Sequence, residues 1–231
     1  MYVNNETGVI QPLHEIAALV KAQQCFLHVD AVQALGKVPI NLQNLPVDLM
    51  SFSSHKIYGP KCLGSLYIRA RPAVGLQALM YGGGQEHGLR PGTLAPFLIV
   101  GFTRALEVVS ANLLEEIQRI SHLRAMFWMG LKDVSKISLN TDLSSSVPHI
   151  CNITFKDIDP ETFLLAIENT LAIAARGSAC TSNHMAPSHV LRAMNISAQN
   201  AYNSFRFSFG RYTTEADIKK TLICLKMLLA K

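Results

Sequence analysis

The sequence lacks the features that mark several large classes of protein. It has no apolar run long enough to cross a bilayer, and no charged-then-apolar leader opens it. Only 16% of its 231 residues are charged while 49% are hydrophobic, which excludes an extended disordered chain. The net charge of +5 is scattered without a basic block, so neither a nucleic-acid partner nor a membrane is expected. What remains is a globular protein of one large or two smaller domains.

The sequence has few cysteines, and no two of them stand at a spacing typical of a paired motif. Five cysteines, an odd number without a CxxC motif, indicate a reducing compartment, here the cytoplasm. HExxH and clusters of Cys and His at ligand spacing are also missing, so no metal site is expected. Three cysteines stand in apolar patterns and are predicted to pack as small hydrophobic side chains: Cys25, Cys151 and Cys224.

Apolar periodicity in the first half predicts an α/β protein. Residues 13–24 place apolar side chains on one face of a helix. Three short apolar runs predict buried strands of one sheet: 25–31, 47–53 and 63–69. Apolar positions from residue 102 predict one long helix, or two joined helices, up to about residue 133. A boundary near residue 110 would then separate a domain of residues 1–110 from a domain of residues 111–231.

The second half mixes strands and helices. Residues 149–155 alternate like a strand, and "DPETFLLAIENT" (159–170) begins with an aspartate cap followed by proline. "NSFRFSF" (203–209) alternates strictly between phenylalanine and polar residues, which predicts a strand with one buried face. A final helix is predicted from about Thr213.

Lys56 is the first candidate for chemistry, in "SFSSHKIYGP" (51–60). It follows a predicted strand at the point where α/β folds commonly open a ligand crevice, outside the carboxyl ends of the strands. A lysine desolvated at such a point is a nucleophile toward a carbonyl carbon. The alternative is a surface lysine on a turn.

Asp30 ends the preceding predicted strand, in "HVDAVQ". An unpaired buried carboxylate is costly, so a partner is expected. The partner is either a backbone cap or the ring nitrogen of pyridoxal phosphate, which an aspartate keeps protonated. Ser53, Ser54 and His55 could then donate hydrogen bonds to the phosphate of that cofactor.

Two further side chains and one loop carry weaker signals. Cys180 in "ARGSACTSN" lies among small polar residues that predict an exposed loop, where it is either a nucleophile or an incidental thiol; Cys62, in a turn, is its only rival. Arg206 either holds a carboxylate or lines a solvated strand face. The loop "YGGGQEHGLRPGT" (81–93) could cradle a phosphate, although it does not fit the dinucleotide fingerprint.

Six blocks in order resemble the cysteine desulfurases, pyridoxal phosphate enzymes of the fold-type I, class V aminotransferase group. The blocks are "HVDAVQALGKVPI", "DLMSFSSHKIYGPKCLGSLYIR", "GGGQEHGLRPGTL", "RGSACTSN", "PSHVLRAM" and "FRFSFGRYTTEADI". The resemblance begins at "VNNETGVIQP" and covers nearly all of the chain. It implies a partial α/β sheet of the large cofactor-binding domain in residues 1–110. A smaller α+β C-terminal domain, in residues 111–231, would carry the cysteine loop.

The resemblance implies cofactor contacts residue by residue. Lys56 would form the internal Schiff base with pyridoxal 5'-phosphate and later move protons. Asp30 would pair with the pyridinium nitrogen, and Gln33 with the phenolic oxygen of the ring. Two side chains beside the lysine would contact the phosphate: Ser53 and His55. Thr93 would reach the phosphate bound by the partner subunit of a homodimer.

The resemblance also implies a reaction and its partners. Asn5 and Arg206 would hold the carboxylate of the L-cysteine substrate, and Cys180 would take its sulfur as a persulfide while alanine leaves. The sulfur would pass to an acceptor or an iron–sulfur scaffold protein.

Complete members of this family are longer at the N-terminus, so the resemblance implies that part of the large domain is absent. Two alternatives stay open. One is a truncated, non-catalytic relative that acts as an interaction module or is a gene fragment. The other is a selenocysteine lyase or an aminotransferase relative, although transamination needs no thiol.

Overall fold

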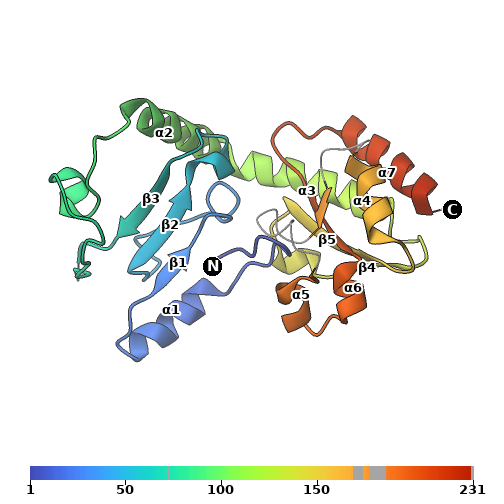
Figure 1. Ribbon diagram of the computed structural model, residues 1–231, viewed down its shortest axis with the longest axis horizontal. Coiled ribbons are helices and arrows are strands. Elements are labelled where there is room, and N and C mark those ends of the chain that lie inside the picture. The colour runs from blue at the N-terminus through green and yellow to red at the C-terminus, as the bar shows by residue number, and fades with distance from the viewer. Residues whose placement is uncertain (72, 169–173, 177–185, 230–231) are drawn as a thin grey trace. The chain divides into compact units, whose positions relative to one another are not determined.

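The computed structural model describes residues 1–71, 73–168, 174–176 and 186–229 (Figure 1). The chain divides into two compact units. The first contains residues 1–2 and 11–113, and the second contains residues 3–10 and 114–231. The short segment Val3–Ile10 therefore belongs with residues far from it in sequence.

The first unit is built on a three-stranded sheet in the order β1-β2-β3, seen in Figure 1. Strand β1 (His28–Asp30) runs parallel to β2 (Leu49–Ser53), and β3 (Gly64–Ile68) is antiparallel to β2. The other elements of this unit are α1 (Leu13–Ala22), the 3-10 helices η1 (Ser54–Ile57) and η2 (Gln85–Gly88), and α2 (Pro96–Ala111). All three strands expected from the apolar runs are present, each shorter than its run.

Helix α1 confirms the predicted amphipathic pattern. Leu13 and Ala17, one turn apart, are buried, and Ile16 and Val20 beside them are half-buried. The predicted long helix is two helices, because α2 ends before Asn112 and α3 (Leu113–Met129) begins after it. No single helix among the described residues is long and apolar enough to span a bilayer; only α2 and α3 counted together pass, by length and composition.

The prediction that Cys25 packs as a small hydrophobic side chain is wrong. Cys25 is exposed, and so is the adjacent Phe26, because β1 begins only at His28. Gln24 adopts φ 55°, a left-handed conformation that turns the chain out of α1. The thiol of Cys25 donates to the carbonyl oxygen of Gln23 at 3.4 Å. The apolar letters of this run therefore lie partly in a turn.

The second unit contains a four-stranded sheet in the order β4-β5-β7-β6, antiparallel throughout. Its strands are β4 (Ile137–Leu139), β5 (Ile150–Phe155), β6 (Ala174–Arg176) and β7 (Ser204–Ser208). Its helices are α3, the 3-10 helix η3 (Leu143–Ser145), α4 (Pro160–Glu168), α5 (His189–Ala193), α6 (Ala198–Tyr202) and α7 (Glu215–Leu229). Asp159 caps α4 as predicted, because its Oδ2 accepts the backbone N–H of Thr162 at 3.2 Å.

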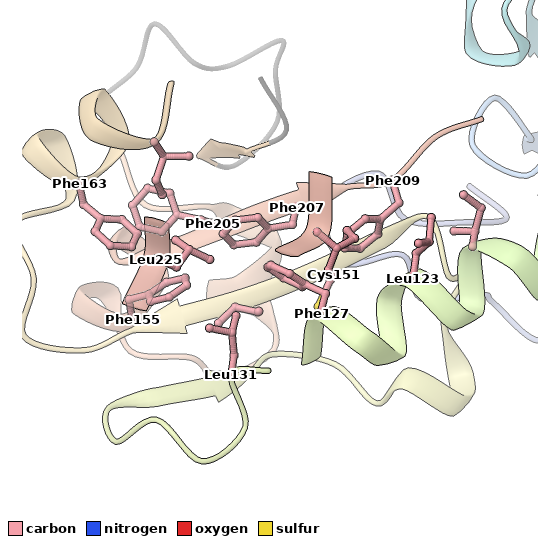
Figure 2. Close-up of a cluster of buried hydrophobic side chains, with 14 residues drawn as sticks. Leu123, Phe127, Leu131, Cys151, Phe155, Phe163, Phe205, Phe207, Phe209 and Leu225 are labelled. Carbon is pink, nitrogen blue, oxygen red and sulfur yellow. The ribbon is translucent and has the colours of Figure 1, made fainter. Parts of the chain in front are cut away.

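The core of the second unit lies on one face of this sheet (Figure 2). Phe205, Phe207 and Phe209 point into it, as their alternation predicts, and the ring centroids of Phe127 and Phe207 are 4.9 Å apart. Helices α3 and α7 contribute the fully buried Ile120 and Leu225 to the same cluster. The opposite face of β5 and β7 is polar, and that face carries Arg206, one of the two candidate substrate residues.

Candidate cofactor and substrate sites

The turn that follows β2 determines whether the side chain of Lys56 is buried or exposed. The chain leaves β2 at Ser53 and makes the single turn of η1, whose Ser54 and Ile57 are buried. His55 and Lys56 point outward from the same turn and are exposed. Lys56 is therefore a lysine on a turn, and the desolvation expected from the sequence is not found.

Gly59 allows the chain to return closely over this turn. A Cβ at residue 59 would lie 2.3 Å from Ser54 Oγ, closer than any side chain tolerates. Ser54 is thereby fully buried, and its hydroxyl has no hydrogen-bond partner among the described residues. Of the three side chains considered for the phosphate, Ser53 and His55 are the two that are accessible.

Ser53 and His55 contact each other directly. Ser53 Oγ lies 2.9 Å from His55 Nδ1, with the donor set by the tautomer of the ring. Partial burial lowers the pKa of His55, and the charges of Lys56 and then Lys61 lower it further. A neutral imidazole is favoured near neutral pH, so the ring can donate from one nitrogen and accept at the other.

Asp30 lies at the same end of the sheet as this turn. Because β1 and β2 are parallel, with Asp30 paired to Ser51, both strands end at one edge. The burial expected for Asp30 is wrong: the residue is exposed, since it ends a strand at the edge of the sheet. Its Oδ1 accepts the backbone N–H of Val32 at 2.9 Å, which is the backbone cap weighed from the sequence.

The other predicted cofactor contacts are spread through the first unit. Gln33 is half-buried, and its Oε1 accepts from Lys37 Nζ at 2.6 Å. Thr93 is exposed, three residues before α2 begins. The glycine-rich loop contains η2, where Glu86 and His87 adopt left-handed conformations with φ 50° and 58°.

Asn5 and Arg206, the two residues expected to hold the substrate carboxylate, are together in the second unit. Arg206 Nη1 donates to the carbonyl oxygen of Asn5 at 2.9 Å, although 201 residues separate them in sequence. Arg206 is half-buried, so the solvated strand face considered as its alternative is not what the structure has.

Cys180 lies outside the described residues. Of the other thiols, Cys151 is buried against the phenylalanine core, and burial raises its pKa to about 12, so it is not a nucleophile. Cys62 is exposed and Cys224 half-buried. Across the described ranges, no group of three or more His, Cys, Asp or Glu side chains could hold a metal ion.

Two buried polar residues beside Asn5 were missed from the sequence. Glu6 is 3% exposed and its Oε2 accepts the hydroxyl of Ser188. Asn152 is 1% exposed on β5, and its Nδ2 donates to the carbonyl oxygen of Glu6 at 3.0 Å. An asparagine inside the apolar run "HICNITF" was the available signal for the second of them.

Comparisons with known proteins give a consistent result. The aminotransferase class-V family matches residues 1–221. The chain is 46% identical over 222 residues to the cysteine desulfurase IscS of Buchnera aphidicola subsp. Schizaphis graminum, covering 96% of this chain and 54% of that relative. The chain thus spans about half the length of the curated relatives it matches.

Solved structures similar to this chain include two NifS-like proteins. One, from Rickettsia africae, superposes with a TM-score of 0.90 at 26% identity, covering all of this chain and 61% of that one. Another, described as a NifS-like protein, superposes with a TM-score of 0.88 at 34% identity and covers 60% of that chain.

Proposed function

Because the chain belongs to the aminotransferase class-V family, we propose that it acts in a cysteine desulfurase. Such an enzyme converts L-cysteine to L-alanine and transfers the sulfur to one of its own cysteines. The observation that carries this proposal is the common edge of β1 and β2, where Asp30 ends one strand, Ser53 ends the other, and Ser54 to Lys56 follow directly.

The side chains at this edge fit pyridoxal 5'-phosphate in their chemistry. The hydroxyl of Ser53 and the imidazole of His55 form a contacting pair on the turn that carries Lys56, and both groups can donate hydrogen bonds to a phosphate. Asp30 would face the ring nitrogen, Gln33 the phenolic oxygen, and Lys56 the aldehyde carbon. When bound, this cofactor supplies an electron sink for the substrate carbons.

The residues of the second unit would handle the substrate. Arg206 and Asn5 would bind the carboxylate of L-cysteine, while Lys56, a residue of the first unit, would move the proton that the β-carbon needs. The Cys180 thiolate would attack the substrate sulfur, so that an S–S bond forms as the C–S bond breaks. The electron pair of the C–S bond stays with carbon, giving alanine and an enzyme persulfide from cysteine and a thiol.

The assembly is part of the proposal. Thr93, the last residue of the glycine-rich loop, is exposed, which suits a contact with the phosphate site of a second copy in a homodimer. Residues 1–110 would serve the cofactor and residues 111–231 the sulfur transfer. An iron–sulfur scaffold or another acceptor would take the sulfur, for cluster or thio-cofactor biosynthesis, and the unpaired cysteines suit the cytoplasm.

A second candidate is a non-catalytic relative that acts as an interaction module. The exposure of both Lys56 and Asp30 favours it, because a working site desolvates these groups.

Cofactor loading separates the two candidates. Purified chain mixed with pyridoxal phosphate should develop a visible absorbance band, which L-cysteine shifts as alanine appears. Lys56→Ala should abolish the band, while Lys61→Ala, which removes an exposed lysine five residues later, should keep it. A chain that develops no such band, or one in which both variants behave alike, would contradict the desulfurase.

The reaction itself is tested at Cys180. Cys180→Ser should keep the absorbance band and lose the persulfide, and normal sulfur release from this variant would contradict the role given to the thiol. Alanine released from selenocysteine but not from cysteine would identify a selenocysteine lyase instead.

A further inference from the structure

The polar face of the second unit's sheet is buried by hydrogen bonding rather than by apolar packing. Asn152, Thr154 and Ser204 lie on it, each at most 2% exposed. Asn140, half-buried, joins them: its Nδ2 donates to Asn152 Oδ1 at 2.6 Å and to Ser204 Oγ at 3.0 Å. A buried network with its members satisfied fixes side-chain orientation, so the amide of Asn152 has one defined direction.

The amide of Asn152 is directed at the turn formed by residues 4–8, called the N-terminal turn below. Three successive carbonyl oxygens of the turn each accept one hydrogen bond. Asn5 O accepts from Arg206 Nη1 at 2.9 Å, Glu6 O from Asn152 Nδ2 at 3.0 Å, and Thr7 O from Thr141 Oγ1 at 3.3 Å.

The turn is also closed internally. Asn4 Oδ1 accepts the backbone N–H groups of Glu6 and Thr7, both at 2.9 Å, and Gly8 N–H donates to Asn4 O at 2.9 Å. Because the turn is closed by its own hydrogen bonds, its residues move together. The hydrogen bond from Asn152 to the carbonyl oxygen of Glu6 therefore also helps to fix the position of Asn5.

We propose that Asn152 is a positioning residue for the carboxylate site of Asn5 and Arg206. Asn152 and Arg206 are direct partners in the β5–β7 register, so one strand pair presents both donors to adjacent carbonyls. Without Asn152, Glu6 O would have lost the donor that the described residues give it, and the turn would shift away from Arg206. This inference rests on the proposed function for its ligand, and on the hydrogen bonds alone for its geometry.

The consequence for binding is specific to the carboxylate. If Asn152 acts through Asn5 and Arg206, its loss weakens ligands that carry a carboxylate and leaves those without one unaffected. L-cysteine and cysteamine form a matched pair, because they share the thiol and the amine and differ only in the carboxylate.

The first measurement needs no ligand. Amide hydrogen exchange of Glu6, Thr7 and Gly8 in the chain should be about five- to tenfold faster in Asn152→Leu, the change expected for one lost hydrogen bond. The control Thr221→Val removes another buried hydroxyl, which donates to Asp217 O in α7, and should leave these amides unchanged. If Asn152→Leu fails to fold, Asn152→Ala replaces it, because it removes the amide without adding a charge or a larger apolar side chain. Unchanged exchange in the folded variant overturns the inference.

The second measurement uses the chain loaded with pyridoxal phosphate. The dissociation constant of L-cysteine should rise by about five- to tenfold in the Asn152 variant, while that of cysteamine stays the same. Equal weakening of both ligands means a general structural defect and also overturns the inference. If the unaltered chain binds neither ligand, the proposed function fails, and the exchange result alone decides whether Asn152 holds the turn.

Discussion

At the scale of single residues, the turn after β2 concentrates positive charge around one imidazole. His55 stands between the charges of Lys56 and Lys61 and contacts Ser53. Desolvation of the imidazole lowers the pKa of His55 most, and the charges of Lys56 and Lys61 lower it further, so the ring remains neutral to lower pH than a free histidine does. Desolvation and the two nearby cations together favour a neutral imidazole beside Ser53.

The pKa of His55 should respond to substitution of its neighbours. Its midpoint, followed by the NMR shifts of the ring protons, should lie below the ordinary value of about 6.5. Lys56→Gln should raise it toward that value, and Lys61→Gln should raise it less, whereas Lys21→Gln on α1 should not move it. Because the folded pKa is lowered, the associated stability is present above the ordinary pKa and is lost as pH falls through the folded value. A midpoint that falls in Lys56→Gln would contradict this account.

The positions of Lys56 and Asp30 at the strand ends could be predicted from the sequence, but the exposure of their side chains could not. Lys56 and Asp30 were found because polar residues follow short apolar runs, and the parallel β1–β2 pair does bring both strand ends to one edge. The exposure of a side chain at that edge depends on which distant segments of the chain cover it, and a local sequence pattern does not contain this information. Asn152 was overlooked for the same reason, since its partner Glu6 lies 146 residues away in sequence.

At the scale of elements, periodicity was the dependable signal. The Phe205–Phe209 alternation predicted β7 and its buried face, because period two has a single structural meaning in a strand. It failed at Cys25, where an apolar run began before its strand did. The length of an apolar run does not show where the preceding turn ends. The left-handed conformation of Gln24 could not be predicted either, because glutamine rarely adopts it.

Helix α7 offers a matched test of which face carries its stability. Leu225 is fully buried against the phenylalanine core, while Ile223, two residues earlier, is 62% exposed. Leu225→Ala should lower the free energy of unfolding by about 2–5 kcal/mol, because it leaves a cavity in the core. Ile223→Ala removes a similar side chain and should cost less than about 0.5 kcal/mol. Denaturant titrations of both variants check this, and equal losses would mean that the helix packs on a different face.

At the scale of the whole molecule, the two units are not consecutive in sequence. The segment Val3–Ile10 joins the second unit through hydrogen bonds and the isolated bridge of Val9 with Ser146, while residues 1–2 and 11–113 form the first. A single boundary near residue 110 could not have shown this. The arrangement gives Asn5 to the unit of Arg206, although it is close in sequence to the unit of Lys56.

Cofactor binding should also be measurable in the thermal unfolding of the chain. A ligand that binds only the folded state adds about 2.7 kcal/mol at a hundredfold excess over its dissociation constant. For a chain of this size that corresponds to a rise in Tm of about 5–10 °C. Scanning calorimetry with pyridoxal phosphate should show this rise for the unaltered chain and lose most of it in Lys56→Ala. Arg104→Ala, which breaks only an exposed ion pair with Glu107 on α2, should keep it. A rise of the same size in Lys56→Ala would mean that the cofactor binds elsewhere, because the stabilisation would then not depend on the amine at the edge of β1 and β2.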